Sequence, residues 1–253
     1  MKERRQKEIL DYILAEEFTE VKKIAVKFQV SEMTVRRDLA NLEKSGLIKC
    51  VFGGGVEKTG DQSEPSYKLR MYDNSKEKEG IALLADKLIT DTDLIFLDIG
   101  STCLYLAKKI INRNITVVTN WLPNMIELSK GNKCNIVNTG GEIDKKELNS
   151  IGIIAYEGIS NFHFTKAFIG VGGINGEGIS DFRIEITEIK KKVIKCANEV
   201  IILADHSKFG KTAPINVASF KSSNIRKIIT ADIAQIDSQL IKKISDLGIE
   251  IIS

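Results

Sequence analysis

Two adjacent arginines, Arg36 and Arg37, are the residues of this chain with the most specific chemistry. They lie in a stretch where apolar residues recur at helical spacing and can bury one stripe. Ser31 precedes the stretch and can accept a hydrogen bond from a free N–H of the first turn, so it is a predicted N-cap. Thr34, Arg36 and Arg37 then lie exposed near the N-terminal end, which is the end that meets base edges in helix-turn-helix proteins. We therefore predict a DNA-reading helix.

The neighbouring segments complete a winged helix. Glu8–Leu14 and Val21–Phe28 have helical apolar spacing. The second of these helices, a turn at Gln29 and Val30, and the arginine helix form the predicted helix-turn-helix. Leu47–Phe52 alternates weakly and runs into Gly53 and Gly54, where glycine permits the tight reversal of a hairpin. We assign the DNA-binding role to the arginine helix and to this glycine wing. The alternative is a small helical interaction module in which the two arginines are merely solvated.

A second group of residues follows five apolar, strand-like runs. Asp98, Gly100, Ser101 and Thr102 follow the first run, and their free N–H groups, hydroxyls and helix N-terminus can bind an anion. In open α/β sheets, ligands bind beyond the carboxyl ends of the strands. Donors for phosphate and acceptors for sugar hydroxyls therefore predict a polyol-phosphate pocket. The residues after the other four runs are Thr119 and Asn120, Gly140 and Gly141, Gly172 and Gly173, and Asp205 and Lys208.

Other readings of these residues stay open. The first turn, taken alone, fits an ordinary strand-to-helix connection with Ser101 or Thr102 as N-cap. In a sugar-phosphate isomerase with an appended DNA-binding domain, Glu185 or Asp205 would be the general base and Lys208 would stabilise an enediolate. Plain recognition of a sugar also needs carboxylates, because hydroxyls need acceptors, so we favour binding without catalysis. A protein-interaction module without a ligand leaves the glycine-rich strand ends unexplained.

The elements that must position this pocket are seven apolar runs separated by helical patterns. Such runs, without polar alternation, indicate a largely parallel sheet covered on both faces, in an open, doubly wound α/β domain. We predict a winged-helix domain at residues 1–58, a linker at 59–74 and the α/β domain at 75–253, opening with a helix over 75–89. The runs are Leu94–Leu97, Thr116–Val118, Asn135–Val137, Ala167–Val171, Glu199–Leu203, Lys227–Thr230 and Ile249–Ile252.

Composition agrees with two domains and excludes several classes. The chain has 253 residues, of which 43% are hydrophobic and 28% are charged, and its net charge of +3 is too small to argue for nucleic acid by itself. Four separated cysteines with no C-x-x-C pair predict buried, reduced thiols in a cytoplasmic protein. With no long apolar run and no signal-like N-terminus, we expect no membrane insertion. His163 and His206 lack metal-ligand spacing, so we predict neither a zinc site nor a cofactor.

The motifs resemble those of a known family. The N-terminal part, with Arg4, Ser31–Leu39, the helix stop Gly46-Leu47 and the wing Gly53-Gly54, is similar to the DNA-binding domain of DeoR-type bacterial transcription regulators. The remainder resembles the effector domain of that family, which is related in fold to ribose-5-phosphate isomerase. The matching residues there are Asp98, Gly100–Thr102, Thr119, Asn120, Gly140, Gly141, Ala167–Gly173, Asp181, Glu185, Asp205 and Lys208–Gly210.

The resemblance implies a repressor of sugar-metabolism genes that binds operator DNA and is released by a phosphorylated sugar. Paired half-sites on DNA call for a homodimer or homotetramer, since a single winged helix binds DNA modestly. The chain departs from the family at three positions, with Ile99, Trp121 and Ile186 where smaller residues are usual. Trp121 either narrows the pocket or packs in the interior, and we favour packing.

Overall fold

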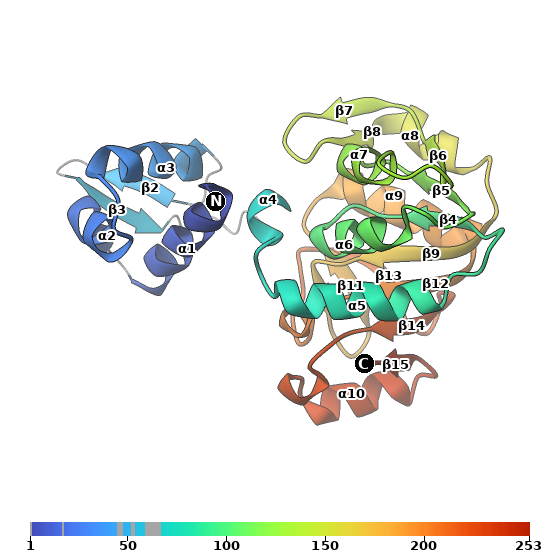
Figure 1. The fold of residues 1–253 in the computed structure, drawn as a ribbon. Coiled ribbons are helices and arrows are strands. Elements are labelled where there is room, and N and C mark those ends of the chain that lie inside the picture. Colours follow the sequence, from blue (N-terminus) through green and yellow to red (C-terminus); the bar gives the residue numbers. More distant parts are fainter. Residues whose placement is uncertain (1, 17, 45–47, 52–53, 59–66) are drawn as a thin grey trace. The chain divides into compact units, whose positions relative to one another are not determined.

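The chain folds into two compact units, Met1–Asp73 and Asn74–Ser253, each with its own apolar core (Figure 1). The computed structural model describes residues 2–16, 18–44, 48–51, 54–58 and 67–253. Residues 59–66 of the predicted linker lie outside this part. The rest of that linker contains the short helix α4 (Tyr67–Arg70), whose Leu69 is buried in the core of the first unit.

The first unit is a winged helix. Its core is built from α1, α2 and α3, and the predicted stripe of α3, Val35, Leu39 and Leu42, is buried as expected. An antiparallel sheet of order β1-β3-β2 forms the wing, and its first strand was not predicted because it is only three residues long. The elements before α4 are α1 (Lys2–Ala15), β1 (Phe18–Glu20), α2 (Val21–Lys27), α3 (Glu32–Lys44), β2 (Ile48–Val51) and β3 (Gly55–Lys58).

The second unit is an α/β domain. Its helices are α5 (Ser75–Lys87), α6 (Ser101–Ile110), α7 (Leu122–Leu128), α8 (Gly152–Ile159), α9 (Ile184–Cys196), α10 (Ser238–Ser245) and the 3₁₀ turns η1 (His206–Lys208) and η2 (Ile233–Gln235). Its strands are β4 (Leu94–Leu97), β5 (Thr116–Thr119), β6 (Asn135–Asn138), β7 (Glu142–Asp144), β8 (Asn149–Ile151), β9 (Phe164–Gly170), β10 (Gly173–Ile174), β11 (Gly178–Asp181), β12 (Ala197–Leu203), β13 (Ile215–Ser219), β14 (Ile225–Ile229) and β15 (Glu250–Ile252).

A seven-stranded parallel sheet of order β15-β14-β12-β9-β4-β5-β6 forms the centre of this unit. All seven predicted runs are strands of this sheet, which confirms the doubly wound prediction. From β4 the chain moves outward to β5 and β6, then returns to β9 on the other side of β4 and continues to β12. Helices α5, α6 and α7 lie on one face and α8 and α9 on the other (Figure 1). The strand order therefore reverses between β4 and β9, and ligands bind at such a switch point in open α/β sheets.

Two small sheets were not predicted. Strands β7 and β8 form an antiparallel hairpin after β6, and β10, β11 and β13 form a second antiparallel sheet that packs on α9. Most of these strands have two to four residues. Asn149 and Ser150 of β8 are polar yet buried, so alternation of polar and apolar residues could not reveal that strand.

The cysteine prediction is only partly right. All four cysteines are free, and Cys103 is buried, where burial, as the largest effect, raises the pKa of its thiol above the usual range. Cys50 is exposed, because it lies on the outward side of the wing strand β2. Across the described ranges, no helix has the length and apolar character needed to cross a lipid bilayer.

Candidate functional site

The N-terminal end of α3 is capped as the sequence predicts. Ser31 Oγ accepts a hydrogen bond from the Thr34 N–H at 3.2 Å and lies 2.9 Å from Thr34 Oγ1. Gln29 adopts a left-handed conformation with φ of 52° in the turn between α2 and α3. The cap and the turn fix where α3 begins, and with it the side chains of the first exposed turn.

The outer face of α3 carries both arginines. Arg37 is exposed, and the Arg36 side chain is 60% exposed with its Nη2 3.8 Å from Glu32 Oε2. Gly54 has φ of +82°, and a Cβ built there would lie 3.6 Å from Arg36 Nη2, so Arg36 lies beside the wing. Gly53 falls outside the described residues. The arginine side chains of α3 and the glycine backbone of the wing thus lie next to each other on one surface.

A buried carboxylate ties α3 to α1. Asp38 is fully buried and accepts hydrogen bonds from Arg5 Nε at 2.8 Å and Gln6 Nε2 at 2.9 Å. Sequence reasoning missed this contact, although a signal was present, since Asp38 falls on the stripe of Val35 and Leu39 at helical spacing. A buried charge needs a partner, so Asp38 sets the position of α3 against α1.

In the second unit, a buried ion network occupies the switch point between β4 and β9. Asp98 directly follows β4, and its Oδ2 accepts the Gly170 N–H at 3.1 Å and lies 2.9 Å from Lys190 Nζ. Lys190 also contacts Asp181 Oδ2 at 2.7 Å and donates to the Gly170 carbonyl. Burial alone would lower the pKa of Lys190, but the charges of Asp181 and Asp98 hold it above its usual value. Lys190 is therefore a cation that joins α9, β4, β9 and β11.

Lys190 was not among the predicted site residues. It lies on the buried stripe of α9 with Ile186, Ile189 and Val193. A lysine at such a position must have buried partners, because leaving the charge unpaired in the core is costly. The stripe was therefore the signal that would have identified it.

The loop after β4 leads into the N-terminus of α6. Gly100 has φ of +128°, a conformation that side-chain-bearing residues rarely adopt. Ser101 and Thr102 are buried in the first turn of α6, where N–H groups have no acceptor within the helix. The loop therefore brings helix donors and two hydroxyls to the carboxyl edge of β4, beside Asp98.

Asn124 joins the ends of β4 and β5. Its Nδ2 donates to the Asp98 carbonyl at 2.9 Å and to Thr119 Oγ1 at 3.2 Å. Asn120 Nδ2 donates to the Ser150 carbonyl at 3.2 Å, which links the end of β5 to the β7–β8 hairpin. Trp121 is fully buried and its indole N–H donates to the Glu147 carbonyl at 2.7 Å, so its side chain packs in the interior.

Two predicted glycine pairs follow β6 and β9. Gly140 and Gly141 connect β6 to β7, Gly172 lies between β9 and β10, and Gly173 is the first residue of β10. A Cβ on Gly173 would lie 2.5 Å from the Lys211 carbonyl oxygen, so the close approach of two backbones requires glycine there.

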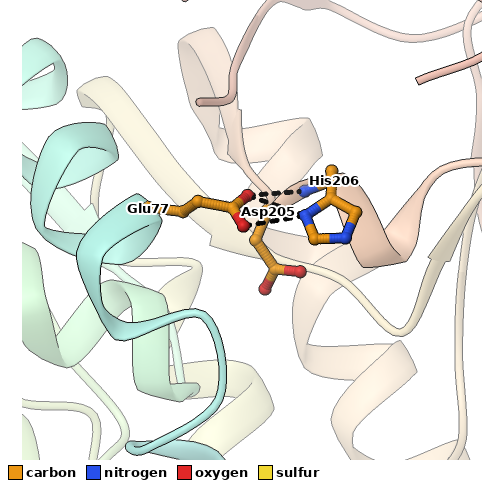
Figure 2. Close-up of side chains that lie close together, drawn as sticks. All are labelled: Glu77, Asp205 and His206. Carbon is orange, nitrogen blue, oxygen red and sulfur yellow. Dashed lines mark hydrogen bonds and ion pairs between the residues drawn. The ribbon is translucent and has the colours of Figure 1, made fainter. Parts of the chain in front are cut away.

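Asp205 and His206 follow β12. Asp205 is buried, caps η1 through the Ser207 N–H at 3.1 Å and accepts from Asn74 Nδ2 at 2.9 Å. His206 Nδ1 lies 2.8 Å and 2.9 Å from the two carboxylate oxygens of Glu77, which reaches it from α5 (Figure 2). No ion pair joins Asp205 to Lys208 in the part of the chain that the structure describes.

The Glu77, Asp205 and His206 group offers ligand atoms within 4.8 Å of one another. Glu77 is already hydrogen-bonded to His206, and the charges of Lys78 and Lys208 act on Asp205. Both features oppose cation binding, so the group is best described as a histidine–carboxylate pair beside a capping aspartate.

Glu185 is not brought into the buried network. It lies in the first turn of α9 with its side chain 52% exposed and 3.8 Å from Arg183 Nε. Arg183 also pairs with Asp144, which ties the start of α9 to the β7–β8 hairpin.

Comparisons with known proteins agree with both units. Residues 5–59 match the DeoR-like helix-turn-helix domain, and residues 73–232 match the DeoR C terminal sensor domain. The HTH-type transcriptional regulator GolR of Listeria innocua is 34% identical over 88% of this chain and 87% of its own length. The glycerol-3-phosphate regulon repressor of Escherichia coli is 29% identical over 83% of this chain and 84% of its own.

Among solved structures, ribose 5-phosphate isomerase A of Methanocaldococcus jannaschii is similar over 54% of this chain and 55% of that chain, with 19% identity and a TM-score of 0.40. The two family matches lie in order and together cover most of the chain. This chain therefore belongs to the DeoR family of helix-turn-helix transcription regulators.

Proposed function

We propose that this DNA-binding regulator is a repressor of sugar-metabolism genes that a phosphorylated sugar releases from its operator. One observation carries the proposal. Hydrogen-bond donors that can bind an anion lie beside buried acceptors that can bind the hydroxyl groups of a sugar, at the switch point of the sheet. Gly100, Ser101 and Thr102 supply the donors, and Asp98 and Asn120 supply acceptors. A relative named for the glycerol-3-phosphate regulon supports a phosphorylated polyol as the ligand class.

On the DNA side, we propose that Thr34, Arg36 and Arg37 contact the major groove from the first turns of α3. Ser31 fixes the start of the helix, and the glycine wing lies beside Arg36. Arginine binds guanine edges or phosphates, so these side chains supply both specificity and affinity.

For the ligand, we propose that the phosphate lies at the N-terminus of α6, where helix N–H groups bind anions. Thr119, Asn120, the glycine turns at 140–141 and 172–173, and the Asp205–Lys208 segment then surround the sugar from neighbouring strand ends. Within the described residues no ion pair joins Lys208 to Asp205, which favours a ligand contact over a structural pair. Glu185 is the predicted residue with the weakest support, because its side chain is half exposed beside Arg183.

We propose that the carboxylates bind and do not catalyse. Of the two carboxylates considered as a general base, Asp205 already caps η1 through the Ser207 N–H, and Glu185 is half exposed beside Arg183. Incubation of the pure protein with pentose and hexose phosphates, followed by product analysis, would reveal any isomerase turnover, and the binding role predicts none.

We also propose that the protein works as a homodimer or a larger assembly. A winged helix reads a short site, and repressors of this kind place two of them on paired half-sites. Ile153 and Ile154 of α8 are 71% and 66% exposed, so this helix offers an apolar surface for a second copy.

A thermal-shift screen tests the ligand proposal. A ligand that binds the folded state raises the melting temperature by mass action, about 2.7 kcal/mol of stabilisation at 100 times Kd. We expect one or more sugar phosphates to raise the melting temperature more than inorganic phosphate does. A flat response to all sugar phosphates would refute the proposed ligand class.

A further inference from the structure

Several buried polar atoms beside the β7–β8 hairpin have no hydrogen-bond partner among the described residues. The side chains concerned are all 0% or 1% exposed. In native proteins, almost all such atoms pair with protein, ordered water or ligand. The atoms are Asp98 Oδ1, Asn120 Oδ1, Asn124 Oδ1, Asn149 Nδ2 and Oδ1, and Ser150 Oγ.

Hydrogen bonds place the side chains of Asp98, Asn124, Asn120 and Ser150 in one patch. Asn124 Nδ2 donates to the Asp98 carbonyl at 2.9 Å, which joins the end of β4 to α7. The Ser150 N–H donates to the Asn120 carbonyl at 2.7 Å, and Asn120 Nδ2 donates back to the Ser150 carbonyl. Asn149 forms an antiparallel β-bridge with Trp121, so its side chain lies on the Trp121 side of the hairpin, and the Asn120 and Ser150 side chains share the other side. The patch therefore lies where the hairpin meets the carboxyl ends of β4 and β5.

Most of the unpaired atoms in the patch are hydrogen-bond acceptors. Asn120 and Asn124 each donate Nδ2 to a carbonyl oxygen, so flipping either amide would set two oxygens against each other, and the unpaired atom is Oδ1 in both. Asp98 Oδ1 is a carboxylate oxygen and also an acceptor. These three atoms need donors, which hydroxyl groups supply and a phosphate dianion does not. The Ser150 hydroxyl can both donate and accept.

We propose that this patch is the hydroxyl-binding half of the effector site, with Ser150 of the hairpin as a ligand-contacting residue that the sequence did not indicate. The proposal rests on the proposed function, because the same ligand places its phosphate at the N-terminus of α6. The ligand is a polyol or sugar phosphate with at least two adjacent free hydroxyls at the end remote from the phosphate.

Such a ligand also acts on the hairpin. The patch has no exposed surface while the hairpin is closed, so a ligand enters only when the hairpin moves away from β5. Leaving the patch atoms unpaired disfavours the closed, ligand-free state, and ligand hydroxyls remove that penalty. The hairpin is held through the Leu122 N–H to Leu148 carbonyl bond of 3.0 Å and through the ion pair between Asp144 and Arg183. Binding therefore favours closure of the hairpin onto the start of α9.

Ser150→Ala tests the proposal against a matched control, Ser180→Ala. Both serines are buried, but Ser180 Oγ accepts the Ala213 N–H at 2.8 Å, while Ser150 Oγ has no hydrogen-bond partner among the described residues. Without ligand, Ser180→Ala is expected to lower the melting temperature, whereas Ser150→Ala leaves it unchanged or raises it. With the sugar phosphate that stabilises the wild type most in the thermal-shift screen, Ser150→Ala weakens binding about 3- to 10-fold, as loss of a neutral hydrogen bond does.

The outcomes separate this inference from the proposed function. If Ser150→Ala lowers the melting temperature of the free protein as much as Ser180→Ala does, the hydroxyl has a partner without ligand and the inference is wrong. Undiminished ligand affinity in Ser150→Ala overturns it as well. If ribitol or glucitol stabilises the protein and no sugar phosphate does, the patch still binds hydroxyl groups, and only the proposal that the ligand carries a phosphate is refuted. No response to any polyol or sugar phosphate refutes both.

Discussion

At the scale of single residues, buried charges on otherwise apolar helical stripes decide how the sites are held. Asp38 of α3 and Lys190 of α9 both lie on such stripes, and both join elements distant in the sequence. The sequence predicted the outward-facing arginines and Asp98, because their positions follow from spacing and from strand ends. It could not identify the partners Arg5 and Asp181, because pairing depends on tertiary contacts that spacing does not encode.

Replacing Asp38 tests how α3 is anchored to α1. Asp38→Ala leaves Arg5, which is about a quarter exposed, and Gln6 without their acceptor, so we expect a loss of about 1–3 kcal/mol in the free energy of unfolding. Glu32→Ala on the same helix removes only an exposed pair with Arg36 and should change stability by less than about 0.5 kcal/mol. Equal effects in urea denaturation would contradict the anchoring role.

Asp205 predicts a pH dependence of stability. Burial alone would raise the pKa of this carboxyl, but the Ser207 hydrogen bond and the charge of Lys78 bring the pKa below its usual value of 3.8. The folded state thus favours the carboxylate, and this stability is present above about pH 4 and lost as the pH falls through the lowered pKa. Asp205→Asn should therefore be less stable than wild type at pH 7, with the difference shrinking toward pH 3. A difference that stays constant over this range would exclude the carboxylate as its source.

At the scale of elements, the sequence predicted the repeated apolar strands of the large sheet but not the short strands of the small sheets. Seven apolar runs became the seven parallel strands, since a strand buried on both faces has a continuous apolar signature. The β7–β8 hairpin carries the opposite pattern, with Ile143 39% exposed and Asn149 fully buried. Part of the candidate effector site lies on this hairpin, so that part could not be predicted from alternation.

The loop between β4 and α6 gives an element-scale prediction. Gly100 has φ of +128° and no atoms within 4 Å of a built Cβ, so Gly100→Val strains the backbone without a collision. We expect the shifted loop to abolish stabilisation by sugar phosphates while DNA binding persists, which makes the variant a non-inducible repressor. Gly210→Val, at a φ of +73° and also free of nearby atoms, is the control for strain alone. A full ligand response in Gly100→Val would move the phosphate elsewhere.

At the scale of the whole molecule, regulation requires that ligand binding in one unit alters DNA binding by the other. The coupling is reciprocal, so a sugar phosphate that weakens DNA binding is itself bound more weakly in the presence of operator, typically by a factor that corresponds to about 1–3 kcal/mol. An assembly with paired winged helices increases the effect, because both half-sites are lost together.

Helix α8 supplies the prediction for assembly. Ile154→Asp places a charge on a surface residue that is 66% exposed, so the fold of the single chain should persist while self-association weakens. Leu83→Asp, on α5 and 46% exposed, is a comparable change away from α8. Analytical ultracentrifugation should show a shift toward monomer for Ile154→Asp alone. An unchanged sedimentation coefficient for Ile154→Asp would exclude α8 as the interface.

Fluorescence anisotropy on operator DNA tests the central claim most directly. A site selected from random duplexes with the wild-type protein is titrated with and without the stabilising sugar phosphate, and with Arg37→Ala as the control for base reading. We predict that the sugar phosphate weakens operator binding about 5- to 150-fold, and that Arg37→Ala weakens binding by about 1–3 kcal/mol. Operator affinity that is the same with and without the sugar phosphate would contradict the account.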